Sequence, residues 1–220
     1  MSNWRDPNPL PKWPLIANDD DDDDDDDDEE EKKSRQGGLA ALGLDLLRKG
    51  RSIIISEPVT PKLTQRVLAS LLWLDADSSD PIKIFINTPG GSADDGFAIY
   101  DIIRFVRAPV YNITLGLNAS AGILVLLSVP KERRLALPST RLMMHQPSGG
   151  GRGTASDIEI TASEIMKLRE KANVLISEQT GQPLEKVETD TDRDFWLSAQ
   201  EALDYGLVGR IVERIDNLGI

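Results

Sequence analysis

The stretch Leu115–Pro130 reads LGLNASAGILVLLSVP and places Ser120 at the start of an apolar run. We expect Val110–Leu115 to be a buried strand, Gly116–Ala119 a tight turn, and Gly122–Val129 a short buried helix. Ser120 would then lie at a strand-to-helix junction, where the free N–H groups of the helix's first turn can stabilise negative charge. Close packing of small side chains is the alternative explanation for this stretch.

The composition limits the chemistry available to the chain. It has 220 residues, no cysteine and one histidine, which excludes disulfides, thiolate catalysis and cysteine-ligated zinc. The longest apolar stretch is too short to span a bilayer, and the N-terminus lacks the pattern of a secretory signal. We therefore expect a soluble cytoplasmic protein that binds no metal and does not enter a membrane.

Negative charge is concentrated near the N-terminus. Residues 1–38 carry 14 acidic and 5 basic side chains, and the run Asp19–Asp28 is followed directly by three glutamates. Like-charge repulsion and four prolines predict a disordered tail over residues 1–38 and a folded domain over 39–220. The tail is interpreted as a solvating segment, a docking segment for a basic partner, or a propeptide. The domain has 23 acidic and 20 basic side chains, so nucleic-acid binding is not indicated.

Strand and helix patterns alternate from residue 39 onward. This alternation predicts an α/β fold in which helices pack on parallel strands. The expected strands are Ser52–Ile55, Ile82–Ile86, Val110–Leu115, Arg134–Leu137, Arg141–His145 and Gly209–Val212. The expected helices are Leu39–Leu47, Pro61 to about Leu74, Asp95–Val106, Gly122–Val129 and a short helix that begins after Ser198.

The longest helical pattern follows a glycine-rich segment, residues 149–153. Apolar residues recur at steps of three and four from Ile158 to Leu175, and Gly181 and Pro183 mark the end of the helix. A helix of about two dozen residues is roughly 35 Å long, which is more than a domain of this size needs. We expect it to project from the domain and to contact a partner.

Three further places can hold chemistry. Pro89-Gly90-Gly91 follows a buried strand, and its glycines allow a tight turn whose N–H groups approach a ligand closely. His145 ends another strand, and Asp194 lies in an acidic segment after the long helix. Together with Ser120, these residues supply the nucleophile, base, carboxylate and oxyanion donors that acyl transfer by serine requires. Taken singly, each has a structural explanation: an ordinary turn, a structural histidine or a solvated carboxylate.

Five separated motifs resemble the proteolytic subunit of the Clp protease family. They are NTPGGS at residues 87–92 with AIYD at 98–101, NASAG at 118–122, MMHQP at 143–147, ASDIEI at 155–160 and DTDRD at 190–194. They occur in the family's order and at its spacing. The resemblance runs from about Leu46 to Val212 and leaves out the acidic tail.

The resemblance implies a serine endopeptidase with Ser120 as nucleophile, His145 as general base and Asp194 as the carboxylate. The oxyanion-hole donors would be the backbone N–H groups of Gly91 and Ala121. The implied fold is a crotonase-like α/β spiral with a projecting handle helix. It implies a tetradecamer of two stacked seven-subunit rings, either homomeric or mixed with a paralogue.

The resemblance also implies partners. Gly149, Gly150 and Gly151 would pair through their backbone with unfolded protein substrates. Phe85 and Phe105 would belong to a groove that docks an AAA+ Clp ATPase. This subunit would need no cofactor, because the partner ATPase uses the ATP.

Two other functions fit parts of the sequence. One is a non-catalytic structural subunit of a mixed Clp ring, which is suggested by Ala121 where the family usually has Met, and by Lys83 where it has an aromatic residue. The other is a crotonase-type acyl-CoA enzyme, which shares the fold and uses backbone N–H groups to hold an oxyanion.

Overall fold

The computed structural model describes residues 41–219. The chain divides into two units, Met1–Leu42 and Gly43–Ile220, and all the elements named below belong to the second. The predicted acidic tail and its boundary at residue 38 lie outside the described residues. Among the described residues, no helix is long and apolar enough to cross a membrane.

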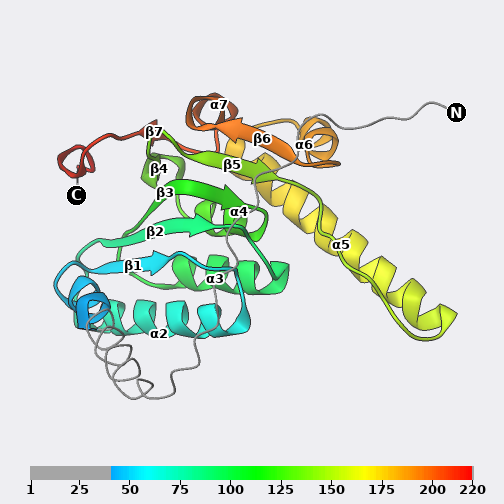
Figure 1. Ribbon diagram of the computed structural model, residues 1–220, viewed down its shortest axis with the longest axis horizontal. Helices are drawn as coiled ribbons and strands as arrows, with labels where there is room; N and C mark the ends of the chain where they lie inside the picture. Colours follow the sequence, from blue (N-terminus) through cyan, green and yellow to red (C-terminus); the bar gives the residue numbers. More distant parts are fainter. Residues whose placement is uncertain (1–40, 220) are drawn as a thin grey trace, which may run out of the picture. The chain divides into compact units, whose positions relative to one another are not determined.

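A mostly parallel sheet forms the centre of the second unit (Figure 1). Its five parallel strands in spatial order are β1 (Ser52–Ile55), β2 (Ile82–Thr88), β3 (Val110–Ala119), β4 (Arg134–Ala136) and β7 (Arg210–Ile211). A further pair branches from the path: β5 (Arg141–Met144) runs parallel to β3, and β6 (Phe195–Ser198) runs antiparallel to β5. The expected α/β class is confirmed.

Helices join these strands. The α-helices are α2 (Pro61–Asp77), α3 (Ala93–Phe105), α4 (Ala121–Leu126), α5 (Ala155–Thr180), α6 (Leu184–Asp190) and α7 (Ala199–Tyr205). Two short 3-10 helices are η1 (Lys131–Arg133) and η2 (Ile215–Asn217), and residues 43–48 are also helical. The predicted N-caps Thr60 and Ser198 accept hydrogen bonds from Leu63 and Glu201 N–H respectively.

One face of the sheet is covered by α2 and α3. Along β2, Ile82, Ile84 and Ile86 are fully buried against these helices, whereas Lys83 and Phe85 face the other side and are half-buried. This alternation is the period-two pattern of a strand whose two faces meet different surroundings.

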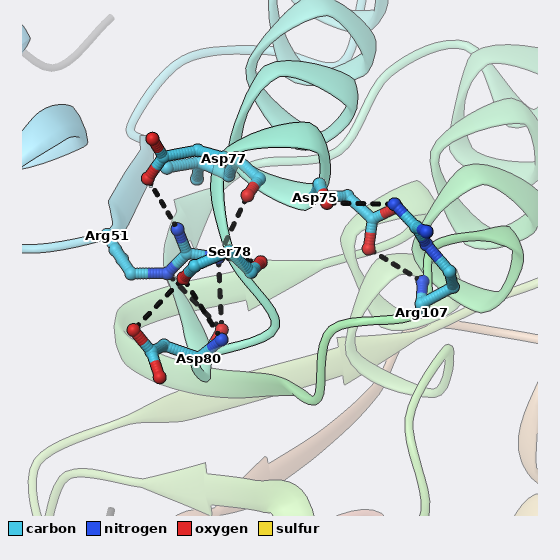
Figure 2. Close-up of polar contacts among 7 residues, drawn as sticks. Arg51, Asp75, Asp77, Ser78, Asp80 and Arg107 are labelled. Carbon is cyan, nitrogen blue, oxygen red and sulfur yellow. Dashed lines mark hydrogen bonds and ion pairs between the residues drawn. The ribbon is translucent and has the colours of Figure 1, made fainter.

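Arg51 holds the C-terminal end of α2 (Figure 2). Its guanidinium donates to the carbonyl oxygens of Leu74, Ser78 and Asp80, each at 3.0 Å, and pairs with the Asp77 carboxylate at 3.3 Å. The last carbonyls of a helix have no partner within the helix and carry partial negative charge. Arg51 therefore binds the Leu74 carbonyl in the last turn of α2 and the carbonyls of Ser78 and Asp80 just after it, and fixes this end of α2 against the start of β1.

The predicted turn at Gly116–Ala119 is wrong, because β3 continues to Ala119. Gly116 takes a left-handed conformation with φ of 60°, and the Asn87 side chain accepts the Leu117 N–H at 3.1 Å. This bulge bends β3 without ending it. The first part of the strand pairs with β4, and the part after Gly116 pairs with β5.

Several other boundaries differ from the prediction. The helix expected over Gly122–Val129 begins one residue earlier and ends at Leu126, before Pro130. The sequence patterns missed α6 and β6, which are short and bury few side chains each.

The long helix α5 has 26 residues and ends at Thr180, and its C-cap Gly181 adopts the left-handed conformation typical of this position. Only its C-terminal part contributes buried residues: Asn173, Leu175 and Ile176. The N-terminal part extends beyond the sheet (Figure 1), where Ile158 and Ile160 are exposed. The predicted projecting helix is thus present.

Candidate active site

Ser120 occupies the junction between β3 and α4. Its N–H donates to Met143 C=O on β5 at 2.9 Å, and its C=O accepts the Ile123 N–H at 2.9 Å. Its backbone is in a rarely populated region, with φ of 54° and ψ of −122°. Such strain in a non-glycine residue is typical of functional sites. The hydroxyl makes no capping bond to α4 and is therefore available to another partner.

His145 connects Ser120 to Asp194. Its Nε2 lies 2.8 Å from Ser120 Oγ, and its Nδ1 lies 3.1 Å from Asp194 Oδ1. The histidine side chain is 25% exposed and that of Asp194 is 61% exposed. The structure therefore brings together three residues that are 25 and 49 positions apart in the chain.

The antiparallel pairing of β5 with β6 places the carboxylate. Met144 pairs with Phe195, so the residue after β5 and the residue before β6, His145 and Asp194, lie side by side. Gln146 strengthens this junction, because its N–H donates to Thr191 C=O at 2.6 Å.

The Thr191 side chain ties this segment to α5. It is fully buried, and its hydroxyl donates to Asn173 Oδ1 at 2.9 Å. The orientation of Asp194 therefore depends on contacts with both β5 and the base of α5.

The Pro89-Gly90-Gly91 turn packs directly against Ser120. A Cβ atom at Gly90 would lie 2.6 Å from both the Ser120 Cβ and the Ala119 carbonyl oxygen, so the approach requires glycine. Val59 fixes the turn by donating to Gly90 C=O and accepting the Ser92 N–H.

The two hydrogen bonds between Val59 and the turn involve Gly90 and Ser92, and the Gly91 N–H between them has no partner in the described part of the chain. Ala121 is the first residue of α4, so its N–H also has no partner within the helix. Both predicted oxyanion donors therefore come from segments that adjoin Ser120 and have N–H groups free to bind a ligand.

An apolar pocket opens beside Ser120 and His145. Ala121, Ile123 and Leu124 of α4 form one wall, and Leu168, Ala172 and Ile176 of α5 form another. The sequence patterns did not predict that the long helix lines this pocket. The helical spacing of its apolar residues was the available signal, but it does not show which partner they face.

The other predicted site residues lie elsewhere. Gly149, Gly150 and Gly151 are exposed and form no strand. A Cβ atom at Gly149 or at Gly151 would lie within 3.2 Å of a side chain on α5, so this segment runs along that helix. Phe85 belongs to a cluster on the sheet face opposite α2, whereas Phe105 at the end of α3 is 77% exposed and lies outside that cluster.

Comparisons with known proteins agree with this architecture. The family model described as Clp protease matches residues 38–215. The ATP-dependent Clp protease proteolytic subunit 3 of Rhizobium etli is 53% identical over 166 residues, which cover 76% of this chain and 86% of that protein. The ATP-dependent Clp protease proteolytic subunit of Paracoccus denitrificans is 46% identical over 166 residues, or 76% of this chain and 83% of that protein.

A solved structure of a ClpP1 mutant from Listeria monocytogenes has a TM-score of 0.75 and 45% sequence identity. The match covers 80% of this chain and 99% of that one. The chain therefore belongs to the Clp protease family, and it has the fold of the family's proteolytic subunits.

Proposed function

We propose that this chain is a serine endopeptidase subunit of a self-compartmentalised Clp protease. The observation that carries the proposal is the position of His145 between Ser120 Oγ and the Asp194 carboxylate, at 2.8 and 3.1 Å. A histidine that contacts a hydroxyl with one ring nitrogen and a carboxylate with the other has the arrangement that activates serine.

The reaction follows from this geometry. His145 Nε2 takes the Ser120 proton while Oγ attacks a peptide carbonyl carbon, and the Gly91 and Ala121 N–H groups stabilise the resulting oxyanion. The protonated His145 gives its proton to the leaving amine, which leaves an acyl-enzyme. Water activated by His145 then releases the acid and regenerates Ser120. Asp194 accepts the Nδ1 hydrogen throughout and stabilises the charged imidazole.

The surroundings of Ser120 support a protein substrate. The apolar pocket beside the hydroxyl suits an apolar side chain next to the cleaved bond. The exposed backbone of Gly149–Gly151 can pair with an extended peptide whatever its side chains are. Both features favour unfolded protein substrates of varied sequence.

The assembly is also part of the proposal. The apolar side chains of Ile158, Ile160 and Met166 on α5 are between 48% and 63% exposed and suit contact with a second ring. Two stacked seven-subunit rings, homomeric or mixed with a paralogue, would enclose the site. An AAA+ Clp ATPase would deliver substrates and use the ATP.

Cleavage of a short fluorogenic peptide tests the proposal. We expect the assembled wild-type protein to cleave it, and Ser120→Ala to abolish cleavage without changing the mass of the particle. Ser79→Ala, at an exposed loop position, is the matched control and should retain activity. An assembled particle that does not cleave would favour a non-catalytic ring subunit. Cleavage by pure Ser120→Ala would refute the assignment of the nucleophile.

A further inference from the structure

Two asparagines on β3 lie against the two ends of α4, and both are fully buried. The Asn112 Nδ2 lies 2.7 Å from the Val125 carbonyl oxygen and 3.2 Å from that of Leu126, at the C-terminal end of the helix. Asn118 lies beside Gly122 in the first turn of the same helix, because a Cβ atom at Gly122 would overlap Asn118 Oδ1. The helix α4 therefore runs back along β3, with one asparagine at each of its ends.

The two side chains differ in their hydrogen bonds. The Asn112 Nδ2 also lies 3.0 Å from Ser128 Oγ, so this nitrogen is satisfied, although its Oδ1 has no partner. Neither Oδ1 nor Nδ2 of Asn118 has a hydrogen-bond partner in the part of the chain that the structure describes. A buried amide without partners has lost its hydrogen bonds to water and lowers the stability of the folded state. The presence of Asn118 therefore calls for an explanation other than stability.

Asn118 also adjoins the support of the Gly90 turn. It pairs across the sheet with Thr88, the last residue of β2. The Thr88 hydroxyl accepts the Gly90 N–H at 3.1 Å and donates to Glu57 C=O at 2.7 Å. The Thr88 methyl group faces Gly122, where a Cβ atom would lie 2.5 Å from it. Asn118 is therefore placed where the support of this turn meets the first turn of α4.

The first turn of α4 contains hydrogen-bond donors that the helix itself does not use. The first N–H groups of a helix have no partners within it, and Ser120 provides no side-chain cap. The Asn118 Oδ1 beside Gly122 is an acceptor at the place where such a donor lies. Asn118 is fully buried and does not line the apolar pocket, so it leaves the substrate side of Ser120 free.

We propose that Asn118 is a positioning residue for Ser120 and for the Ala121 N–H. Its Oδ1 accepts a hydrogen bond from a first-turn N–H of α4 as the oxyanion forms, and this bond fixes the Ala121 donor relative to the Gly91 donor. Because the amide is unpaired before the reaction, the interaction favours the transition state over the ground state. The inference rests on the proposed peptidase function and adds a residue outside the triad to it.

Peptide cleavage and thermal unfolding of the assembled protein test the inference. Asn118→Leu replaces the amide by an apolar group with the same number of heavy atoms, and Asn118→Ala removes it, which gives a second test if leucine is too large. We expect kcat to fall about ten-fold in both variants, with KM within about two-fold of wild type. We expect Asn118→Leu to unfold at or above the wild-type temperature, because a buried group without partners is removed.

Asn112→Ala is the matched control on the same strand. It removes hydrogen bonds to the C-terminal end of α4, so it should unfold at a lower temperature than wild type and than both Asn118 variants. Its kcat should stay within about two-fold of wild type, because Asn112 lies at the end of α4 that is distant from Ser120. This opposite pattern separates positioning from a structural role, which would lower kcat and the unfolding temperature together.

Two results would overturn the inference alone: wild-type kcat in both Asn118 variants, or a loss of kcat accompanied by a fall in unfolding temperature as large as that of Asn112→Ala. An assembled wild-type protein that does not cleave the peptide would overturn the proposed function and this inference together. The activity of wild type therefore distinguishes the two failures.

Discussion

Gly90 shows how closely the candidate site constrains single residues. Its φ is 89°, and a Cβ atom there would lie 2.6 Å from Ser120 Cβ. We expect Gly90→Ala to displace the Ser120 turn and to lower kcat at least about 100-fold, because misplacing a reacting group by about 1 Å costs this much. Peptide cleavage by the assembled variant measures the effect.

Gly43→Ala is the matched control for this change. Gly43 has no positive φ, and a Cβ atom there meets nothing within 4 Å. Because Gly43 is not one of the candidate site residues, this variant should keep kcat within about two-fold of wild type. Full activity in Gly90→Ala would show that the turn does not position Ser120.

Replacing Asp194 by asparagine tests the contribution of its negative charge to the proposed reaction. Asp194→Asn keeps the shape of the side chain but removes the charge that holds the His145 proton on Nδ1. We expect kcat to fall by about 100-fold or more with little change in KM, because the loss affects the transition state. Asp204→Asn, at an exposed position on α7, should stay near the wild-type rate. An unchanged kcat in Asp194→Asn would contradict the proposed triad.

The start of α5 is an element whose stability depends on pH. The Asp157 carboxylate accepts hydrogen bonds from the Thr154 hydroxyl at 2.7 Å and N–H at 2.9 Å, and these bonds lower its pKa. A lowered pKa in the folded state stabilises the helix start above the unfolded value near 4, and this contribution disappears as the pH falls through the folded value.

Hydrogen exchange of the first turn of α5 measures this contribution. At neutral pH, we expect faster exchange in Asp157→Asn than in wild type over residues 155–160. As the pH falls through the lowered folded-state pKa of Asp157, the wild-type carboxylate also becomes protonated, and the two proteins should become more alike. A difference that does not change with pH would show that the charge of Asp157 has no part in capping.

The helix ends were predictable from the sequence where capping residues stand next to the apolar pattern of a helix. Thr60 with Pro61, Ser198 with Glu201, and Gly181 mark helix ends in the sequence, and the structure has helix ends there. The bulge at Gly116 was not predictable, because it depends on the Asn87 side chain of a neighbouring strand. A run of small residues predicts a turn when that tertiary contact is unknown.

The candidate site, too, was predictable from local sequence patterns only in part, because some of its geometry depends on tertiary contacts. Ser120 and His145 follow strands that the sequence patterns reveal, although their roles came from motif resemblance. Asp194 precedes β6, which local patterns missed, and only the pairing of β6 with β5 brings it to His145. The walls of the apolar pocket depend on how α5 packs against α4, which no local pattern contains.

At the scale of the whole molecule, the proposed contact between two rings depends on α5. Ile158, Ile160 and Met166 are 48%, 63% and 58% exposed on a helix that extends beyond the sheet. Exposed apolar surface of this kind marks sites of protein contact. We expect the triple substitution of these residues by serine to leave the fold intact and to halve the particle mass, from two rings to one. Sedimentation velocity measures the change.

The control for this experiment is Glu159→Gln on the same exposed part of α5. It should leave the particle mass unchanged. A triple variant that still forms the wild-type particle would contradict the role given to these apolar side chains.

The most direct test of the central claim is covalent labelling by a fluorophosphonate, which reacts with activated serines. Mass spectrometry of the labelled peptides identifies the modified residue. If Ser120 is activated by His145, wild type is labelled at Ser120 and His145→Ala is not. An assembled, folded wild-type protein with no label at Ser120 would contradict the account and would favour a non-catalytic subunit or an acyl-CoA enzyme.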